Sequence, residues 1–247
     1  MLEKIGFFRF GRDHSEPRRA LECALEKSHG AENALVVLPE AFNIAVPYQQ
    51  REGKQNFDRM IVKELQALSE RFKVAFVAGL VINEPCGPAP PRSAAYLVTN
   101  AGQSLICYKM GSDDTAGDNY TPCTRRADRN NPFAYEGVRI GTLICVDANP
   151  PTRYPAFHCR LQTVVNASDV VCVPAHMAKG NFQDGIAGCE ISLIPPSSNK
   201  RLILANSRPG GINSFITDCN GRILEPTVGG EHNQVVTLPF GTPLSSS

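Results

Sequence analysis

Three residue types suited to covalent catalysis each follow an apolar run in this sequence. Glu40 follows LVVLP, Lys109 follows SLICY, and Cys145 ends the run RIGTLIC. Because side chains at the carboxyl ends of strands meet at a crevice in α/β sheets, we expect the three to lie close together. They predict attack of a thiol on a carbon–nitrogen bond, with Glu40 taking the thiol proton and Lys109 favouring the thiolate.

The same residues provide for the later steps of such a reaction. Lys109 and the backbone N–H that follows Cys145, that of Val146, are suited to stabilise the oxyanion of a tetrahedral intermediate. Glu40 would then give its proton to departing ammonia and activate the hydrolytic water. The sequence therefore predicts Cys145 as nucleophile, Glu40 as general base and acid, and Lys109 as transition-state stabiliser.

Hydrophobic periodicity predicts the strands and helices that position these residues. One helix is expected after Ser15, a suitable N-cap, with Pro17 in its first turn and its end at Gly30. Two more amphipathic helices are expected over residues 61–72 and 157–165. The expected strands are Lys4–Phe10, Leu35–Leu38, Val74–Ile82, Ala94–Thr99, Ser104–Met110, Val138–Cys145, Val170–Pro174, Arg201–Ala205, Gly211–Thr217 and Gln234–Leu238.

This order of elements predicts an α/β protein in which strands outnumber helices, as in two sheets packed face to face with helices outside. No repeat or low-complexity linker interrupts the chain, so residues 1–247 are expected to form a single domain. Two long loops, residues 84–92 and 111–132, are expected to help shape the site, because loops of this length are uncommon in compact domains.

The segments around the three residues resemble the nitrilase (carbon–nitrogen hydrolase) superfamily, whose Glu-Lys-Cys triad lies in P-E-x-F, Y-x-K and G-x-x-I-C-x-D contexts. The corresponding segments occur in the same order, as Pro39–Phe42, Tyr108-Lys109 and Gly141–Asp147. With further likeness from Val170 to Leu224, the resemblance covers nearly the whole chain. It implies a four-layer αββα sandwich of two mixed β-sheets with outer helices. It also implies a thioester acyl-enzyme, no metal or organic cofactor, and a homodimer or higher homo-oligomer.

The loop after Lys109 departs from the family pattern. Most members carry a second glutamate there, whereas the only glutamate between Lys109 and Cys145 is Glu136, too late in the loop to match. Asp113, Asp114 and Asp118 could substitute for it, and Asp118 lies nearest the usual spacing. Residues 194–199 contain two prolines where members have a helix, so that side of the pocket is expected to be remodelled.

The residues after Cys145 favour a small amide or N-carbamoyl substrate over a nitrile. They are Val146-Asp147, without the Trp-Glu pair typical of true nitrilases, and so resemble the amidase and carbamoylase branches. Nitrile hydrolysis on the same triad is the alternative substrate class. The candidates for substrate binding or for the second carboxylate are Asp118, Val146 and His176.

Side chains after the nucleophile have two interpretations each. Arg153 and Arg160 could bind a substrate carboxylate as planar forks, or could lie at the surface or pack against helices. His176 could line the pocket or be a structural histidine.

Three other functions compete with the prediction of a Glu-Lys-Cys hydrolase. A Cys–His thiol hydrolase would use Cys145 with His176 or His158 and would need neither the glutamate nor the lysine. A degenerate member of the fold would be a scaffold or small-molecule binder with an unreactive Cys145, which the missing second glutamate favours. Metal binding by His158-Cys159 matches no zinc spacing, so no metal site is expected.

Composition limits the partners. With 25 basic and 24 acidic side chains and a net charge of +1, the chain has no electrostatic footprint for nucleic acid or an anionic membrane. No apolar stretch approaches the roughly 18 residues that span a bilayer, and charges interrupt the N-terminal apolar patch, so neither a membrane partner nor a signal peptide is expected. Nine cysteines, none spaced C-x-x-C, are expected to be reduced thiols in a cytoplasmic protein.

Overall fold

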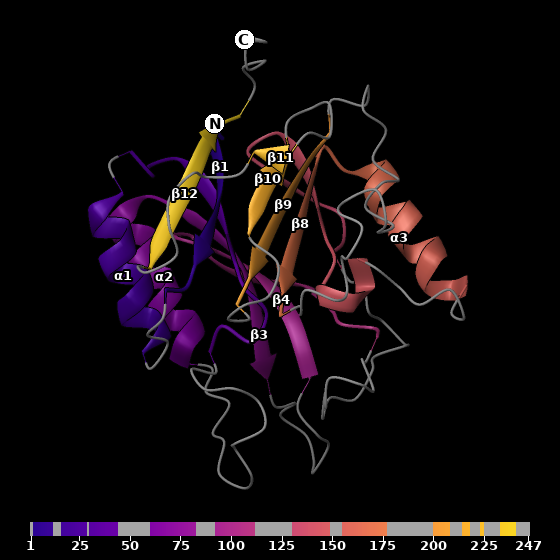
Figure 1. Cartoon of the computed structure of the whole chain (residues 1–247), viewed down its shortest axis with the longest axis horizontal. Helices are drawn as coiled ribbons and strands as arrows, with labels where there is room; N and C mark the ends of the chain where they lie inside the picture. Colours follow the sequence, from indigo (N-terminus) through magenta and orange to yellow (C-terminus); the bar gives the residue numbers. More distant parts are fainter. Residues whose placement is uncertain are drawn as a thin grey trace, which may run out of the picture.

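A computed structural model describes most of the chain, and its strands form two six-stranded sheets that face each other (Figure 1). The described residues are 2–11, 16–28, 30–43, 60–82, 92–111, 130–148, 155–176, 200–207, 214–217, 223–224 and 233–240.

The first sheet contains β1 (Lys4–Arg9), β2 (Ala34–Leu38), β3 (Ala75–Ile82), β4 (Arg92–Thr99), β5 (Gly102–Tyr108) and β12 (Gln234–Pro239). Its strand order is β12-β1-β2-β3-β4-β5. The β1–β2 and β2–β3 pairs are parallel, and the other three pairs are antiparallel. Since β3–β4 and β4–β5 are both antiparallel, β5 runs in the same direction as β2. Residues that follow β2 and β5 therefore lie at the same edge of this sheet.

The second sheet contains β6 (Phe133–Tyr135), β7 (Val138–Thr142), β8 (Val170–Ala175), β9 (Arg201–Asn206), β10 (Phe215–Thr217) and β11 (Ile223–Leu224). Its order is β11-β10-β9-β8-β7-β6, with parallel pairing of β7–β8 and β8–β9. The carboxyl ends of these three parallel strands therefore lie together, and Figure 1 shows this edge on the same side of the molecule as the carboxyl end of β3.

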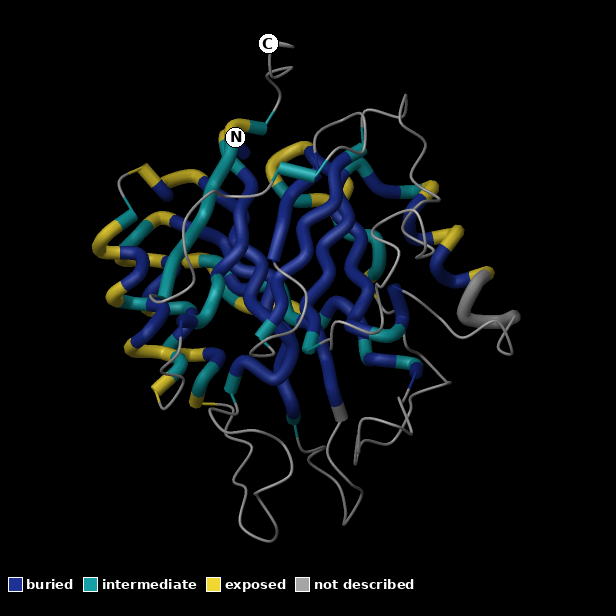
Figure 2. Tube along the Cα trace, viewed as in Figure 1, coloured by how far each residue is buried: buried dark blue, intermediate teal, exposed yellow. Residues whose placement is uncertain are grey.

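Alternating side chains give each sheet two apolar faces. In β1, Ile5 and Phe7 belong to the core between the sheets, whereas Phe8 belongs to the core under the helices. Figure 2 shows the resulting band of buried strands through the centre of the molecule. Helices α1 (Pro17–Lys27) and α2 (Met60–Phe72) cover the first sheet, and α3 (Pro155–Ala167) packs on β7 of the second. The predicted αββα sandwich is confirmed.

The helix predicted after Ser15 forms, but with a different N-cap. Its N-cap is Glu16, which makes no side-chain capping hydrogen bond, so the prediction of Ser15 at that position is wrong. Pro17 occupies the first turn as predicted, where its missing N–H costs no hydrogen bond. The buried stripe of Ala20, Leu21, Ala24 and Leu25 stabilises the helix against the sheet.

The prediction of one strand running through Val138–Cys145 is wrong at its end. The strand β7 stops at Thr142, three residues before Cys145, and a short 3₁₀ turn, η2 (Cys145–Ala148), follows. Likewise β5 ends at Tyr108, so Lys109 lies just beyond its strand. The two-residue β11 and three-residue β6 were not predicted, because elements this short carry too few residues to show a period.

Candidate active site

Glu40 lies in the turn after β2, where the ends of the two sheets meet. Its backbone N–H donates to the carbonyl of Ala175, the last residue of β8, at 3.4 Å. Gly79 of β3 permits this approach, since a Cβ there would lie 2.8 Å from the Glu40 Cα. The next residue, Ala41, has a φ of 57°, which residues with a Cβ seldom adopt. The tight turn thus directs the chain out of β2 immediately at the buried Glu40.

Lys109 forms a buried ion pair with Glu40. The distance from Lys109 Nζ to Glu40 Oε1 is 3.0 Å, and each side chain is only 3% exposed. Ser93 of β4 connects the two, because its Oγ donates to Glu40 Oε1 at 2.9 Å and its carbonyl accepts the Lys109 backbone N–H at 2.9 Å. Such pairing offsets the cost of removing both charges from water. Ser93 was not among the predicted site residues, because a single serine in a strand gives no signal of its own.

Cys145 begins the turn η2 with a φ of 50°, a left-handed conformation that costs a residue with a Cβ about 1–2 kcal/mol. Strain of this kind is concentrated at functional sites. The thiol belongs to a residue that is 7% exposed, and it lies close enough to the Glu40 carboxylate, the Lys109 ammonium and the backbone N–H of His176 for each of them to affect its pKa. The structure therefore brings together Glu40, Lys109 and Cys145 from three separate segments.

Burial raises the pKa of the Cys145 thiol far above its ordinary value of about 8.5, since a poorly solvated thiolate is unfavourable. The negative charge of Glu40 raises this pKa further. Lys109 and the His176 N–H lower it, as predicted for Lys109, but burial outweighs both. The resting thiol is therefore neutral, and a base must remove its proton before the sulfur can react as a thiolate.

We expect alkylation of Cys145 to rise about tenfold per pH unit from pH 6.5 to 9, because only the thiolate reacts and the raised pKa keeps its fraction small. Iodoacetamide labelling followed by peptide mapping measures this, with the exposed Cys23 and Cys159 as references in the same digest. At neutral pH Cys145 should label more slowly than either. A plateau below pH 8 would show instead that the resting site holds a thiolate.

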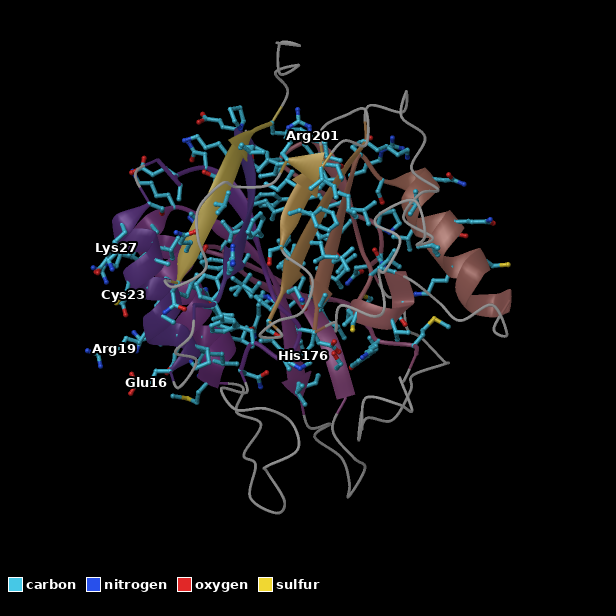
Figure 3. All side chains as sticks on the ribbon, viewed as in Figure 1. Glu16, Arg19, Cys23, Lys27, His176 and Arg201 are labelled. Atoms are coloured by element: carbon cyan, nitrogen blue, oxygen red, sulfur yellow. The ribbon has the colours of Figure 1, made fainter. Side chains whose placement is uncertain are left out.

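His176 follows β8 at the same edge of the second sheet; Figure 3 places it at the opposite end from Arg201, where β9 begins. Its Nδ1 lies 2.6 Å from the Oγ of Ser207, which follows β9. Ser207 Oγ also donates to the carbonyl oxygens of Glu40 and Ala175 at 3.5 and 3.4 Å. His176 thus has its ring against Ser207, while its backbone N–H lowers the pKa of the Cys145 thiol. Val146 is half-buried in η2.

The interpretation of Arg160 as a substrate-binding fork is wrong. Its guanidinium is buried against the protein's own Asp147, with Arg160 Nη1 donating to Asp147 Oδ2 at 2.6 Å. Arg160 lies on the inward side of α3, so its charge is used inside the fold. The candidates Asp118 and Arg153 and the proline-containing residues 194–199 lie outside the described residues, as does the side chain of His158.

Within the part of the chain that the structure describes, no three His, Cys, Asp or Glu side chains are grouped so as to hold a metal ion. Nor does any helix in that part have the length and apolar character needed to cross a membrane.

The sequence matches no protein-family model and no curated protein. Solved structures nevertheless share the fold at low identity. An amidase from Nesterenkonia sp. matches with a TM-score of 0.67 and 19% identity, covering 96% of this chain and 90% of that chain. Nit3 of Saccharomyces cerevisiae, a member of branch 10 of the nitrilase superfamily, matches with a TM-score of 0.68 and 16% identity, covering 99% of this chain and 96% of that chain. A carbon–nitrogen hydrolase from Helicobacter pylori G27 matches with a TM-score of 0.65 and 18% identity, covering 95% of this chain and 88% of that chain.

The Nesterenkonia amidase has been described in several states. Variants of it hold acrylamide and butyramide, and in another the acetamide moiety of fluoroacetamide is covalently added at the active-site cysteine. At identities of 16–19%, these likenesses establish only the fold of the present chain, which is a nitrilase-like α/β sandwich.

Proposed function

We propose that this protein is a carbon–nitrogen hydrolase that cleaves a small amide or N-carbamoyl compound through a thioester on Cys145. The observation that carries the proposal is the buried cluster of Glu40, Lys109 and Cys145, in which Lys109 and Glu40 form an ion pair of 3.0 Å and both charges act on the pKa of the thiol. The likeness in fold to amidases and carbon–nitrogen hydrolases supports it.

The geometry accounts for formation of the acyl-enzyme. As the Cys145 sulfur attacks the substrate carbonyl carbon, its proton passes to the neighbouring Glu40 carboxylate. Negative charge develops on the carbonyl oxygen, and the Lys109 ammonium stabilises it. Collapse of the tetrahedral intermediate breaks the carbon–nitrogen bond, and Glu40 gives its proton to the departing ammonia or amine.

Hydrolysis of the thioester uses the same groups in reverse. Glu40, again a carboxylate, takes a proton from water as the water oxygen attacks the thioester carbon. The carbon–sulfur bond then breaks, the proton returns to Cys145, and the carboxylic acid leaves. The backbone N–H of His176 stabilises the sulfur while it carries negative charge.

An amide rather than a nitrile is the favoured substrate class. The residues after Cys145 lack the Trp-Glu pair of true nitrilases, and amides bind to variants of the Nesterenkonia amidase. A Cys–His hydrolase is less consistent with the site, because the His176 group that lowers the pKa of the thiol is its backbone N–H, while its ring Nδ1 lies 2.6 Å from Ser207 Oγ. A homo-oligomeric state and a cytoplasmic location stay predictions from the sequence.

The test is ammonia release from acetamide, butyramide, N-carbamoylglycine and propionitrile by the purified protein. We expect equal amounts of ammonia and carboxylic acid from at least one amide, because one carbon–nitrogen bond is broken per turnover. Faster release from the nitrile would favour the alternative substrate class. No release from any amide or carbamoyl compound by folded protein would contradict the proposal and favour a degenerate scaffold or binder.

A further inference from the structure

A second buried ion pair lies beside the site, between η2 and α3. Asp147, two residues after Cys145, pairs with Arg160 at 2.6 Å, with side chains 2% and 6% exposed respectively. The mechanism above uses neither residue. Two charges removed from water in this way contribute little net stability compared with well-packed apolar side chains. Their arrangement points instead to a role in fixing the position of the backbone segments that they bind.

The pair binds the backbone on both sides of Lys109. Asp147 accepts the N–H of Met110 at 2.9 Å and that of Gly111 at 2.7 Å, while Arg160 Nη2 donates to the carbonyl of Tyr108 at 3.4 Å. The carboxylate thus holds the segment after Lys109, and the guanidinium holds the residue before it. Because Asp147 belongs to the same four-residue turn as Cys145, the segment that carries the ammonium is tied to the segment that carries the thiol.

We propose that Asp147 and Arg160 are positioning residues that set the placement of the Lys109 ammonium relative to the Cys145 sulfur. The catalytic part of this inference rests on the proposed function. Neither side chain needs to touch substrate, since both act through the backbone of residues 108–111. Errors of about 1 Å in placing a catalytic group can reduce turnover about 10²-fold.

The Asp147→Asn variant should lower kcat about 10- to 100-fold with little change in KM. It should also shift the pH profile of Cys145 alkylation to higher pH, because a displaced Lys109 no longer favours the thiolate. A merely structural role predicts the opposite shift, since a loosened fold hydrates the thiol and lets it react at lower pH. Glu40, Lys109 and the His176 N–H are the other groups that face the thiol.

Two further variants keep the test decisive. Asp169→Asn removes a more exposed Asp–Arg pair, in which Arg139 Nη2 lies 2.9 Å from Asp169 Oδ1, and should leave both readouts unchanged. The double variant Asp147→Asn/Arg160→Met removes both buried charges. It should regain the melting temperature lost by the single variant, yet keep the low kcat and the shifted profile.

The alkylation profile separates this inference from the proposed function, because it needs no substrate. A shifted profile in a protein that hydrolyses nothing would support the positioning role and contradict only the function. A profile and kcat for Asp147→Asn equal to those of Asp169→Asn would overturn the positioning role.

Discussion

Replacing Cys145 with alanine should reduce turnover of the best amide by about 10⁵-fold or more, as in other hydrolases that lose their nucleophile. The thiol is the group that forms the thioester, and the small methyl group left behind cannot attack a carbonyl carbon. Ammonia release and single-turnover trapping of the acyl-enzyme by mass spectrometry measure the loss. Substrate binding should persist, because the other polar groups of the site stay in place.

The matched control is Cys172→Ala in β8. Cys172 is buried like Cys145, and burial raises the pKa of its thiol as it does for Cys145. Loss of its small apolar side chain should cost about 1 kcal/mol of stability and leave kcat nearly unchanged. Turnover retained by Cys145→Ala, or lost equally in both variants, would contradict the assignment of Cys145 as nucleophile.

Replacing Lys109 with methionine should lower kcat at least about 10³-fold and the free energy of unfolding by about 3–5 kcal/mol. The kinetic loss is expected because the oxyanion loses its positive partner. The loss of stability is expected because the Glu40 carboxylate, 3% exposed, is left without the ammonium 3.0 Å away. Urea unfolding and ammonia release measure the two effects separately.

The double variant Glu40→Gln/Lys109→Met separates structure from catalysis at this pair. With both charges gone, stability should return to near that of the wild type, while turnover stays lost. Arg71→Met, which removes a cation from the surface pair Arg71–Glu26 at 2.8 Å, is the control and should cost less than about 1 kcal/mol. Full activity of Lys109→Met would instead favour the Cys–His hydrolase alternative, which needs no lysine.

The positions of most strands along the chain, and the three candidate residues that follow apolar runs, could be predicted from sequence because both signals are local. Apolar runs such as Leu35–Leu38 and Val170–Pro174 must be buried, and runs of that length are typical of buried strands rather than of helices. Since Glu40 directly follows one such run and Lys109 another, their approach at one sheet edge follows from the parallel direction of β2 and β5.

The partners of the buried charges could not be predicted, because each is set by residues distant in sequence. The sequence around Arg160 is compatible with either of two roles, a substrate-binding fork or the partner of Asp147. Only the packing of α3 against η2 distinguishes the two roles. Ser93 is 53 residues from Glu40, and nothing near it in sequence indicates their hydrogen bond.

The sequence by itself determined which side chains are available for chemistry and that they lie at the ends of apolar runs, because residue type and hydrophobic pattern are properties of short segments. Only the tertiary structure decided the protonation state of Cys145. Burial raises the pKa of the thiol and leaves it neutral, while Glu40 raises that pKa further and Lys109 lowers it. The same packing holds Cys145 in a left-handed turn rather than in the strand that its apolar neighbours predict.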